Sequence, residues 1–336
     1  MEVRVKVKPL EPLMLRGPGE FDPSARGVAV SARSVGWPSP STFAGTLISE
    51  LLSGKAVRPL ARDWDAFVNK YVNLLREAGV EWIRGPYVWD ESVVYVPLTL
   101  DGKIFYVIDL NDLEYYSSNY LGKSYEKFKK AIEKLNRRVH VVHAERTGVA
   151  LRVRDDGVKG VREGFLYTET FTALRRNAHY VFEAGFLRSV EDLKGKAVKF
   201  GGEGRIAELL IDEDLHLTKR LKGFAEGYTV LLSPFLMMEP PCVRIAAGGE
   251  VRVCYKGVEL EVVVGRVGVR GLGFAVAESR RKPLFTAISE GAIVRVENCK
   301  NAHELGLYGC VSELSSEEEL LARMGFGSFY PLEVTR

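Results

Sequence analysis

The chain begins with a strict alternation of apolar and polar residues, in which Val3, Val5 and Val7 share one face. A period of two residues is typical of a strand with one buried face, so residues 1–15 are predicted to form a strand. Apolar runs bounded by turn-forming residues predict further strands over residues 95–108, 147–153, 164–173, 179–187, 197–200, 206–211, 228–238, 251–255, 260–267, 292–296 and 326–334.

Helices are fewer, and two of them begin at recognisable caps. Ser39 or Ser41 is a suitable N-cap for a helix that Gly54 ends, with proline in its first turn. Ser315 or Ser316 caps a helix that reaches residue 323 and carries three glutamates in its first turn. Spacing and composition predict further helices over residues 63–78, 124–138 and 189–193.

These elements predict an α+β fold. When a region at about residues 55–140 is set aside as an insertion, the first half has the order β-α-β-β-α-β, that of a ferredoxin-like (RRM-like) unit. A length of 336 residues is typical of two domains. We therefore predict two such units side by side: residues 1–212 with the insertion, and residues 213–336 as a degenerate second unit.

The composition is that of an ordinary soluble globular protein, with 46% hydrophobic and 27% charged residues. Ser233 and Pro234 interrupt the longest apolar stretch, which is too short to span a membrane. The first residues lack the apolar segment of a signal peptide, so a cytoplasmic location without membrane contact is expected. Glutamine is absent and asparagine is scarce, a profile that fits a thermophilic source.

The four cysteines do not predict a metal site. Cys242, Cys254, Cys299 and Cys310 show no C-x-x-C spacing, and no spacing among the five histidines suggests a ligand set. Disulfides 299–310 or 242–254 are options in a hyperthermophile, and free buried thiols are the alternative. No cofactor is expected, because the chain also lacks a P-loop.

The net charge of 47 − 44 = +3 is weak as a sign of nucleic-acid binding, so any such contact must come from local patches. The segment 201–205, Gly-Gly-Glu-Gly-Arg, lies between two predicted strands. Glycines there let another group approach the backbone, whose N–H groups can face an anion beside Arg205. A bulge without a ligand is the alternative interpretation.

Three other segments have both a binding and a structural interpretation. The helix start at Ser39 and Ser41 could bind phosphate near Arg33, or simply be a capped helix with a buried Trp37. Tyr167 and Phe171 could stack bases or form core. The basic run at residues 280–282, downstream of a glycine-containing segment at residues 270–274, could contact phosphates or be a solvated charge run.

Taken together, these segments resemble the Cmr family of RAMP proteins, subunits of type III-B CRISPR effector complexes. Within it the chain is most similar to the RAMP subunit that holds the 5′ repeat-derived handle of the CRISPR RNA (crRNA) beside the large polymerase-like subunit. The resemblance rests on the segments 37–45, 146–149, 163–169 and 201–205, with weaker support from 281–283 and 325–327.

The resemblance implies a non-catalytic scaffold that binds the crRNA 5′ handle and contacts the large subunit and a neighbouring RAMP backbone subunit in antiviral defence. Phosphate contacts and stacking suit this positioning task. The expected RNA-binding residues are Arg33, Trp37, Ser39, Ser41, Thr42, Arg146, Tyr167, Gly201, Gly202, Arg205, Arg280, Arg281 and Lys282.

Two alternatives remain open at this point. Some RAMP relatives are endoribonucleases that use histidine for acid–base work, and His179 beside Tyr180 is the most nuclease-like pair among candidates that also include His140 and His143. A protein–protein adaptor whose basic patch faces an acidic partner is the other alternative. We expect a protein that is not an enzyme.

Overall fold

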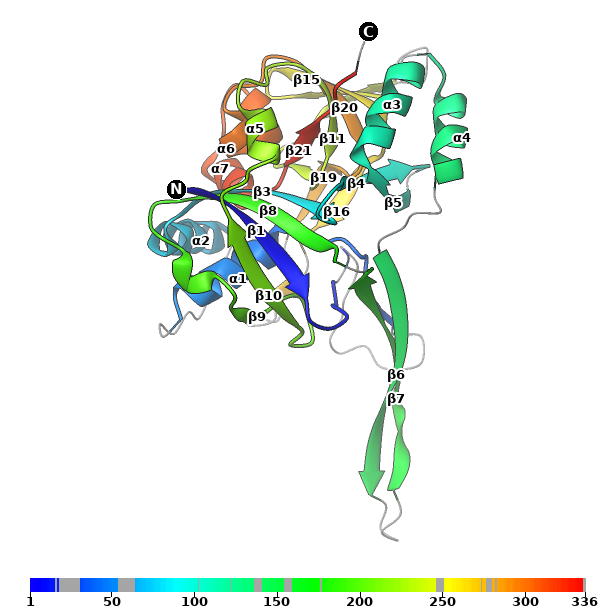
Figure 1. The fold of residues 1–336 in the computed structure, drawn as a ribbon, viewed down its shortest axis with the longest axis vertical. Coiled ribbons are helices and arrows are strands. Elements are labelled where there is room, and N and C mark those ends of the chain that lie inside the picture. Colours follow the sequence, from blue (N-terminus) through cyan, green and yellow to red (C-terminus); the bar gives the residue numbers. More distant parts are fainter. Residues whose placement is uncertain are drawn as a thin grey trace.

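The fold was examined in a computed structural model of the chain. It describes residues 1–15, 17, 31–53, 64–101, 103–121, 123–135, 141–153, 159–175, 177–245, 251–272, 274–275, 280–281 and 283–334. Helices and strands are both abundant, which confirms the α+β class, whereas the assignment to ferredoxin-like units stays a prediction (Figure 1).

A seven-stranded antiparallel sheet forms the first half of the body, in the order β5-β4-β3-β8-β1-β10-β9. Its strands are β1 (Glu2–Pro9), β3 (Val80–Trp89), β4 (Val94–Leu100), β5 (Lys103–Asp109), β8 (His179–Phe186), β9 (Ala197–Lys199) and β10 (Ile206–Asp212). The predicted alternation holds in β1, where Val3, Val5 and Val7 are fully buried. On the other face, Arg4 Nε donates to Asp212 Oδ1 at 2.8 Å, so this side of the strand pair is joined by charge.

Two predicted assignments change in this sheet. The region around residues 55–140 is not a mere elaboration, because β3, β4 and β5 lie in the main sheet and β3 pairs directly with β8. The predicted helix over residues 189–193 is a single 3-10 turn, η1 (Glu191–Leu193). The domain boundaries themselves stay a prediction.

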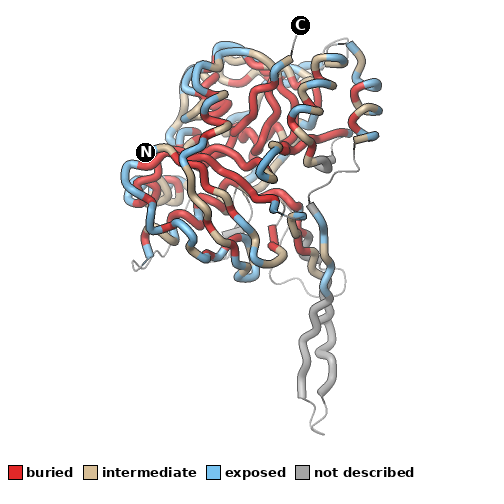
Figure 2. The backbone as a smooth tube through the Cα atoms, viewed as in Figure 1, coloured by how far each residue is buried: buried red, intermediate tan, exposed pale blue. Residues whose placement is uncertain are grey.

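Four helices accompany this half: α1 (Pro40–Leu51), α2 (Trp64–Ala78), α3 (Leu110–Tyr120) and α4 (Tyr125–Leu135). Helix α1 packs on the sheet through Phe43, whose ring stacks on that of Phe182 in β8 with centroids 3.9 Å apart. Helices α3 and α4 form a separate pair at the β5 end of the sheet (Figure 1). The core that these helices cover is continuous with that of the second half (Figure 2).

A long hairpin projects from the body (Figure 1). It consists of β6 (Val141–Val153) and β7 (Lys159–Leu174), with the short β2 (Ser31–Arg33) parallel to β7. The predicted strands at residues 147–153 and 164–173 exist, but they lie in this projection and not in the main sheet. Apolar alternation predicted the strands correctly and could not show which sheet they join.

The second half is built from smaller sheets. The order of its six-stranded sheet is β13-β14-β15-β20-β11-β21, and that of a three-stranded sheet is β12-β19-β16. Their bounds, with those of the pair β17 and β18, are β11 (Gly227–Leu231), β12 (Phe235–Met237), β13 (Cys242–Ile245), β14 (Val251–Tyr255), β15 (Val258–Val264), β16 (Val267–Gly271), β17 (Phe274–Ala275), β18 (Arg280–Arg281), β19 (Leu284–Ile288), β20 (Ile293–Val296) and β21 (Phe329–Pro331).

The helices of the second half are short: α5 (Leu217–Leu221), α6 (Ala302–Leu305), η3 (Gly306–Cys310) and α7 (Ser316–Arg323). The predicted cap of α7 is confirmed, because the Ser315 side chain accepts from the Glu318 N–H while Glu318 accepts from the Ser315 N–H. This reciprocal capping box satisfies two backbone donors that the helix leaves free.

The two halves share buried polar contacts. Arg84 of β3 is fully buried and donates to the carbonyl oxygens of His303 at 3.0 Å and Ala322 at 2.8 Å. Burial lowers the pKa of this guanidinium to about 9. Thr99 of β4 donates its N–H to the carbonyl of Gly291 at 2.8 Å, which fixes the turn before β20. These contacts hold the two halves together in one body.

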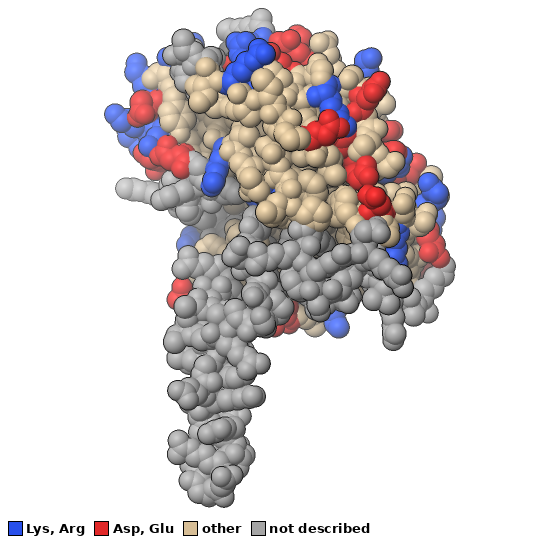
Figure 3. All heavy atoms as spheres, turned by 180° about the vertical axis from the view of Figure 1, so that it is seen from behind, with Lys and Arg blue, Asp and Glu red and all other residues tan. Residues whose placement is uncertain are grey.

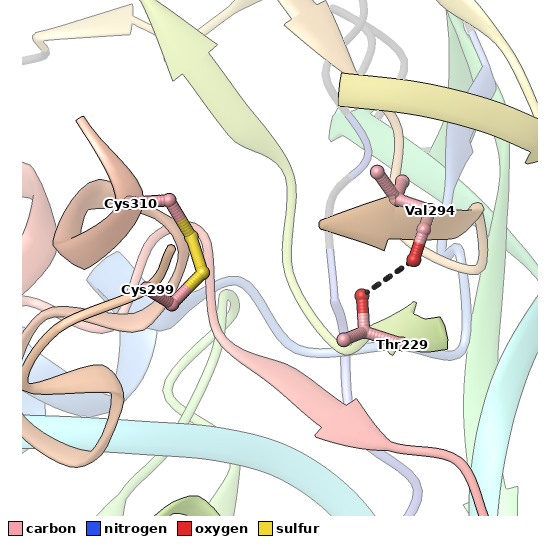
Figure 4. Close-up of a disulfide and its surroundings, with 4 residues drawn as sticks. All are labelled: Thr229, Val294, Cys299 and Cys310. Carbon is pink, nitrogen blue, oxygen red and sulfur yellow. Dashed lines mark hydrogen bonds between the residues drawn. A yellow bond between two sulfur atoms is a disulfide. The ribbon is translucent and has the colours of Figure 1, made fainter. Parts of the chain in front are cut away.

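One disulfide closes between Cys299 and Cys310, near the hydrogen bond of Thr229 to Val294 (Figure 4). Cys242 and Cys254 are free and lie opposite each other on β13 and β14. The first of the two disulfides proposed from sequence is thus present, while the second pair carries thiols. No helix in the described part of the chain is long and apolar enough to cross a membrane.

Candidate nucleic-acid interface

A cavity of about 440 Å³ lies between the two halves of the chain. It is lined by the start of α1, the turn between β9 and β10, the connection from β11 to β12, the end of β16 and the turn after β19. Six of the residues predicted from sequence line it together: Trp37, Ser39, Ser41, Thr42, Gly201 and Gly202. The structure therefore brings together two segments that are about 160 residues apart in the sequence.

The start of α1 faces this cavity without a side-chain cap. Ser39 is the N-cap residue, as predicted, and Pro40 follows it in the first turn. The Ser39 hydroxyl bonds the Ser41 hydroxyl at 2.9 Å and not a backbone N–H. No acidic residue lies in the first turn of this fully described helix. Pro40 has no N–H, and the Thr42 N–H donates to the Ser39 carbonyl oxygen at 2.9 Å, so it is mainly the positive end of the helix dipole that favours an anion here.

Trp37 supports this corner from beneath. Its indole Nε1 donates to the carbonyl oxygen of Leu232 at 2.8 Å, and its ring meets Tyr180 edge to face. The residue is only 6% exposed, so little of the ring is available for a base to stack on. This corrects the expectation that Trp37 is a stacking platform, because burial and the indole hydrogen bond make it part of the core.

The glycine segment is approached closely, and the approaching group belongs to the protein itself. Gly201 has φ = +83°, and a Cβ there would lie 2.6 Å from the carbonyl oxygen of Met14. The Gly202 N–H donates to the same oxygen at 2.8 Å. That donor therefore does not face an anion, contrary to the sequence interpretation, although Gly202 still forms part of the cavity wall.

Arg205 lies next to this wall, and its guanidinium and that of Arg146 both lie over the Phe171 ring. Its guanidinium is 4.2 Å from the centroid of the Phe171 ring, and that of Arg146 is 5.3 Å from the same centroid. Arg205 Nη1 also donates to Glu11 Oε2 at 2.6 Å. Phe171 is buried, so its suggested role in base stacking is wrong. Two arginines on one ring form a cationic surface beside the cavity.

The remaining predicted residues lie elsewhere or beyond description. Arg33 pairs with Thr170 in the ladder of β2 and β7, and Tyr167 lies opposite Gly148 in the hairpin. Arg280 and Arg281 form β18, paired with Ala275 and Phe274. The side chains of Arg33, Tyr167, Arg280 and Arg281, and the whole of Lys282, lie outside the described residues.

Three charged residues of the cavity were missed. Lys199 and Arg270 line it as cations, and Glu290 lines it as a buried acid whose Oε1 accepts from Arg270 Nη2 at 2.6 Å. Arg270 is the first residue of the segment 270–274, which the sequence analysis selected because of its glycines and not because of this arginine. Nothing local marks Glu290, since only the pairing of β16 with β19 brings these residues together.

The most nuclease-like pair of the sequence, His179 and Tyr180, does not come together in the structure. His179 and Tyr180 are consecutive on β8, so their side chains point to opposite faces. The Tyr180 hydroxyl donates to the Gly36 carbonyl at 2.8 Å, and burial raises its pKa. Burial also lowers the pKa of His179. His143 lies 3.5 Å from Thr172 Oγ1 in the hairpin, and His140 is outside the described residues.

Comparison with known proteins identifies the family. The CRISPR system CMR subunit Cmr3 of Saccharolobus solfataricus is 31% identical over 300 residues, which are 88% of this chain and 86% of that protein. The chain belongs to the Cmr3 family. Residues 5–141 also match the family described as CRISPR-associated protein (Cas_Cmr3), a range that includes the region the motif resemblance did not use.

Solved structures agree with this assignment to Cmr3. A chain of the cryo-EM structure of type III-B Cmr-beta bound to cognate target RNA has a TM-score of 0.70 and 27% identity, covering 98% of this chain and 96% of that chain. A chain of Cmr-beta bound to cognate target RNA and AMPPnP has a TM-score of 0.64 and 28% identity, covering 87% and 86%. The type III-B resemblance inferred from the motifs is thereby confirmed at the level of the family.

Proposed function

We propose that this Cmr3-family chain is a non-catalytic subunit of a type III-B CRISPR complex and binds the 5′ handle of the crRNA at the cavity beside α1. The large polymerase-like subunit and a neighbouring RAMP backbone subunit are its proposed protein partners. The observation that carries the proposal is the uncapped start of α1 in a cavity that also holds Lys199 and Arg270. Backbone donors, hydroxyls and cations are the groups that fix RNA phosphates.

A continuous path leads from this cavity to the hairpin. Met14 bridges Gly202 at the cavity wall, while its neighbour Leu13 bridges Thr172 in β7. Arg205 and Arg146 lie along this junction, on the Phe171 ring. A strand of RNA held at α1 can thus continue over a second pair of cations toward the projecting hairpin, where these cations would contact further phosphates.

The charges elsewhere support a local and not a global attraction. The face of the body seen from behind has a broad uncharged area, with basic and acidic side chains interspersed at its margins (Figure 3). With a net charge of +3, the molecule as a whole exerts little pull on RNA. Preference for the handle therefore has to come from the cavity and the cations beside it.

Helix α7 offers a matched control for the test, because its first turn already carries Glu317, Glu318 and Glu319. Ser41→Asp places a carboxylate at the start of α1 inside the cavity, and Ser316→Asp places one at the exposed start of α7. An acid in a first turn suits the helix dipole, so both variants should fold. Only Ser41→Asp puts a negative charge where the phosphate is proposed to bind.

The measurement is retention of end-labelled RNA with the handle, beside a scrambled RNA, on native and denaturing gels. Handle affinity is expected to fall about tenfold in Ser41→Asp and to stay unchanged in Ser316→Asp. Equal retention of handle and scrambled RNA would favour the adaptor and contradict the proposal. Handle RNA cut by the wild-type chain would instead identify a nuclease.

A further inference from the structure

Glu290 is a buried carboxylate with one oxygen left over. Its side chain is 5% exposed, and Arg270 Nη2 donates to Oε1 at 2.6 Å. No donor among the described residues reaches Oε2. A buried carboxylate oxygen without a partner is costly, and native proteins rarely leave one unpaired without a ligand, water or ion to satisfy it.

The backbone around Glu290 is fixed before any ligand arrives. Thr99 Oγ1 donates to the Glu290 carbonyl at 2.6 Å, and the Gly291 N–H donates to the Leu231 carbonyl at 2.7 Å. Gly291 has φ = +76°, and a Cβ there would lie 2.6 Å from the Thr99 N atom. The turn is therefore restricted to this backbone conformation, which holds the carboxylate at the cavity in a preorganised position.

The same cavity thus presents two different kinds of group. The start of α1 favours an anion, whereas Glu290 Oε2 is a charged acceptor without a donor. Arg270 lines the cavity as well and forms an ion pair with this carboxylate. A ligand that satisfies both ends needs an anionic group and an N–H donor, and a volume of about 440 Å³ is ample for a nucleotide.

We infer that Glu290 is a base-reading residue that accepts a hydrogen bond from the exocyclic amino group of a nucleobase in this cavity. Carboxylates accept from base amino groups, and arginines donate to base ring and carbonyl acceptors. Guanine, adenine and cytosine carry such an amino group, while uracil and hypoxanthine lack it. The inference deepens the proposed function. It rests on that function for RNA as the source of the base, whereas the hydrogen-bonding chemistry of the cavity is argued independently.

Matched nucleotides test the chemistry without RNA. Titration of the full chain with GMP against IMP, with CMP against UMP, and with AMP against purine riboside monophosphate, by NMR or calorimetry at millimolar concentrations, compares ligands that differ at the amino group. In at least one pair, the nucleotide with the amino group is expected to bind about tenfold more tightly, since the acceptor is charged and buried. Equal binding within all three pairs contradicts the inference.

Two variants assign the effect to this carboxylate. Glu290→Gln replaces one oxygen by an NH₂ donor, so the preference for the amino group should vanish or reverse. Glu297→Gln, an acid at the surface that pairs with Arg295, should leave the preference unchanged. Persistence of the preference in a folded Glu290→Gln chain would overturn the inference. If that variant does not fold, the wild-type comparison of the nucleotide pairs still decides.

A second arm identifies the source of the base. In handle RNA, each guanosine is replaced in turn by inosine, each cytidine by uridine and each adenosine by purine riboside, and binding is measured with wild type and Glu290→Gln. A single position at which loss of the amino group weakens only the wild type assigns the base to the RNA. Discrimination among free nucleotides without such a position assigns the site to a free nucleotide. Failure to retain handle RNA at all defeats the proposed function and leaves the first arm intact.

Discussion

Two arginine–glutamate ion pairs lie at or beside the cavity, and they differ in how far the glutamate is exposed. Arg205 with Glu11 and Arg270 with Glu290 both have an N–O distance of 2.6 Å, and both arginine side chains are 17% exposed. Glu11 is 35% exposed, whereas Glu290 is 5% exposed. An exposed carboxylate regains water when its partner leaves, while a buried one does not. The first pair is exchangeable, and the second is fixed.

The difference suits the two proposed tasks. Arg205 has to release Glu11 in order to bind a phosphate, and the low cost of exposing Glu11 permits this exchange. Arg270 has to hold Glu290 in place for base reading, and burial keeps the two together. Under these proposals, the same type of ion pair has two roles. Glu11 is a displaceable counter-ion of Arg205, whereas Glu290 is a recognition element that Arg270 holds in place.

The largest expected contrast is in stability. Arg270→Met leaves Glu290 buried without a cation and should lower the free energy of unfolding by about 3 kcal/mol. Arg205→Met leaves Glu11 in contact with water and keeps an apolar chain on Phe171, so its effect should be much smaller. Urea unfolding at pH 7 measures both. Equal losses in the two variants would show that burial does not separate these pairs.

A smaller contrast is expected in handle affinity. Glu11→Gln removes the anion that competes with phosphate for Arg205, so affinity at low salt should rise about threefold, with the gain shrinking as salt is added. Glu208→Gln serves as the control, because Glu208 pairs with Lys8 on the same sheet. The double variant Glu11→Gln with Arg205→Met should show no gain. A gain that persists in the double variant would place the effect elsewhere.

The smallest contrast is in the pH dependence of stability. The hydrogen bond from Arg205, together with the Ile206 N–H, lowers the pKa of Glu11 below its ordinary value of 4.5, against an opposing effect of burial. The pair therefore contributes its full stability above pH 4.5 and loses it as the pH falls through the lowered pKa. Thermal melts should show a constant difference between wild type and Glu11→Gln from pH 7 to pH 5, then a narrowing one. A difference that does not narrow below pH 4.5 would rule out this pair as its source.

Local signals predicted local structure well. The caps at Ser39 and Ser315 gave the starts of α1 and α7, and the alternation of Val3, Val5 and Val7 gave the buried face of β1. Each depends on residues within one turn or one strand, where propensity and periodicity act. The α1 start and the glycine segment were each predicted as a binding segment, but their gathering in one cavity was not predicted.

Long-range pairing was beyond the sequence. Glu11 and Arg205 are 194 residues apart, and nothing in either neighbourhood specifies the other. The partner that approaches Gly201 is the Met14 carbonyl, which a glycine alone could not identify. Strand β3 was passed over within an assumed insertion, since period-two patterns do not say which sheet a strand joins.

The residues Leu13 and Met14 have a mechanical consequence. These two residues are consecutive in the chain. Leu13 is hydrogen-bonded to Thr172 in the hairpin, and Met14 is hydrogen-bonded to Gly202 in the cavity wall. A torque applied to the hairpin is therefore transmitted over two residues to the wall of the cavity. The hairpin and the cavity wall are connected through two consecutive residues, so a rotation of the hairpin should also move the cavity wall.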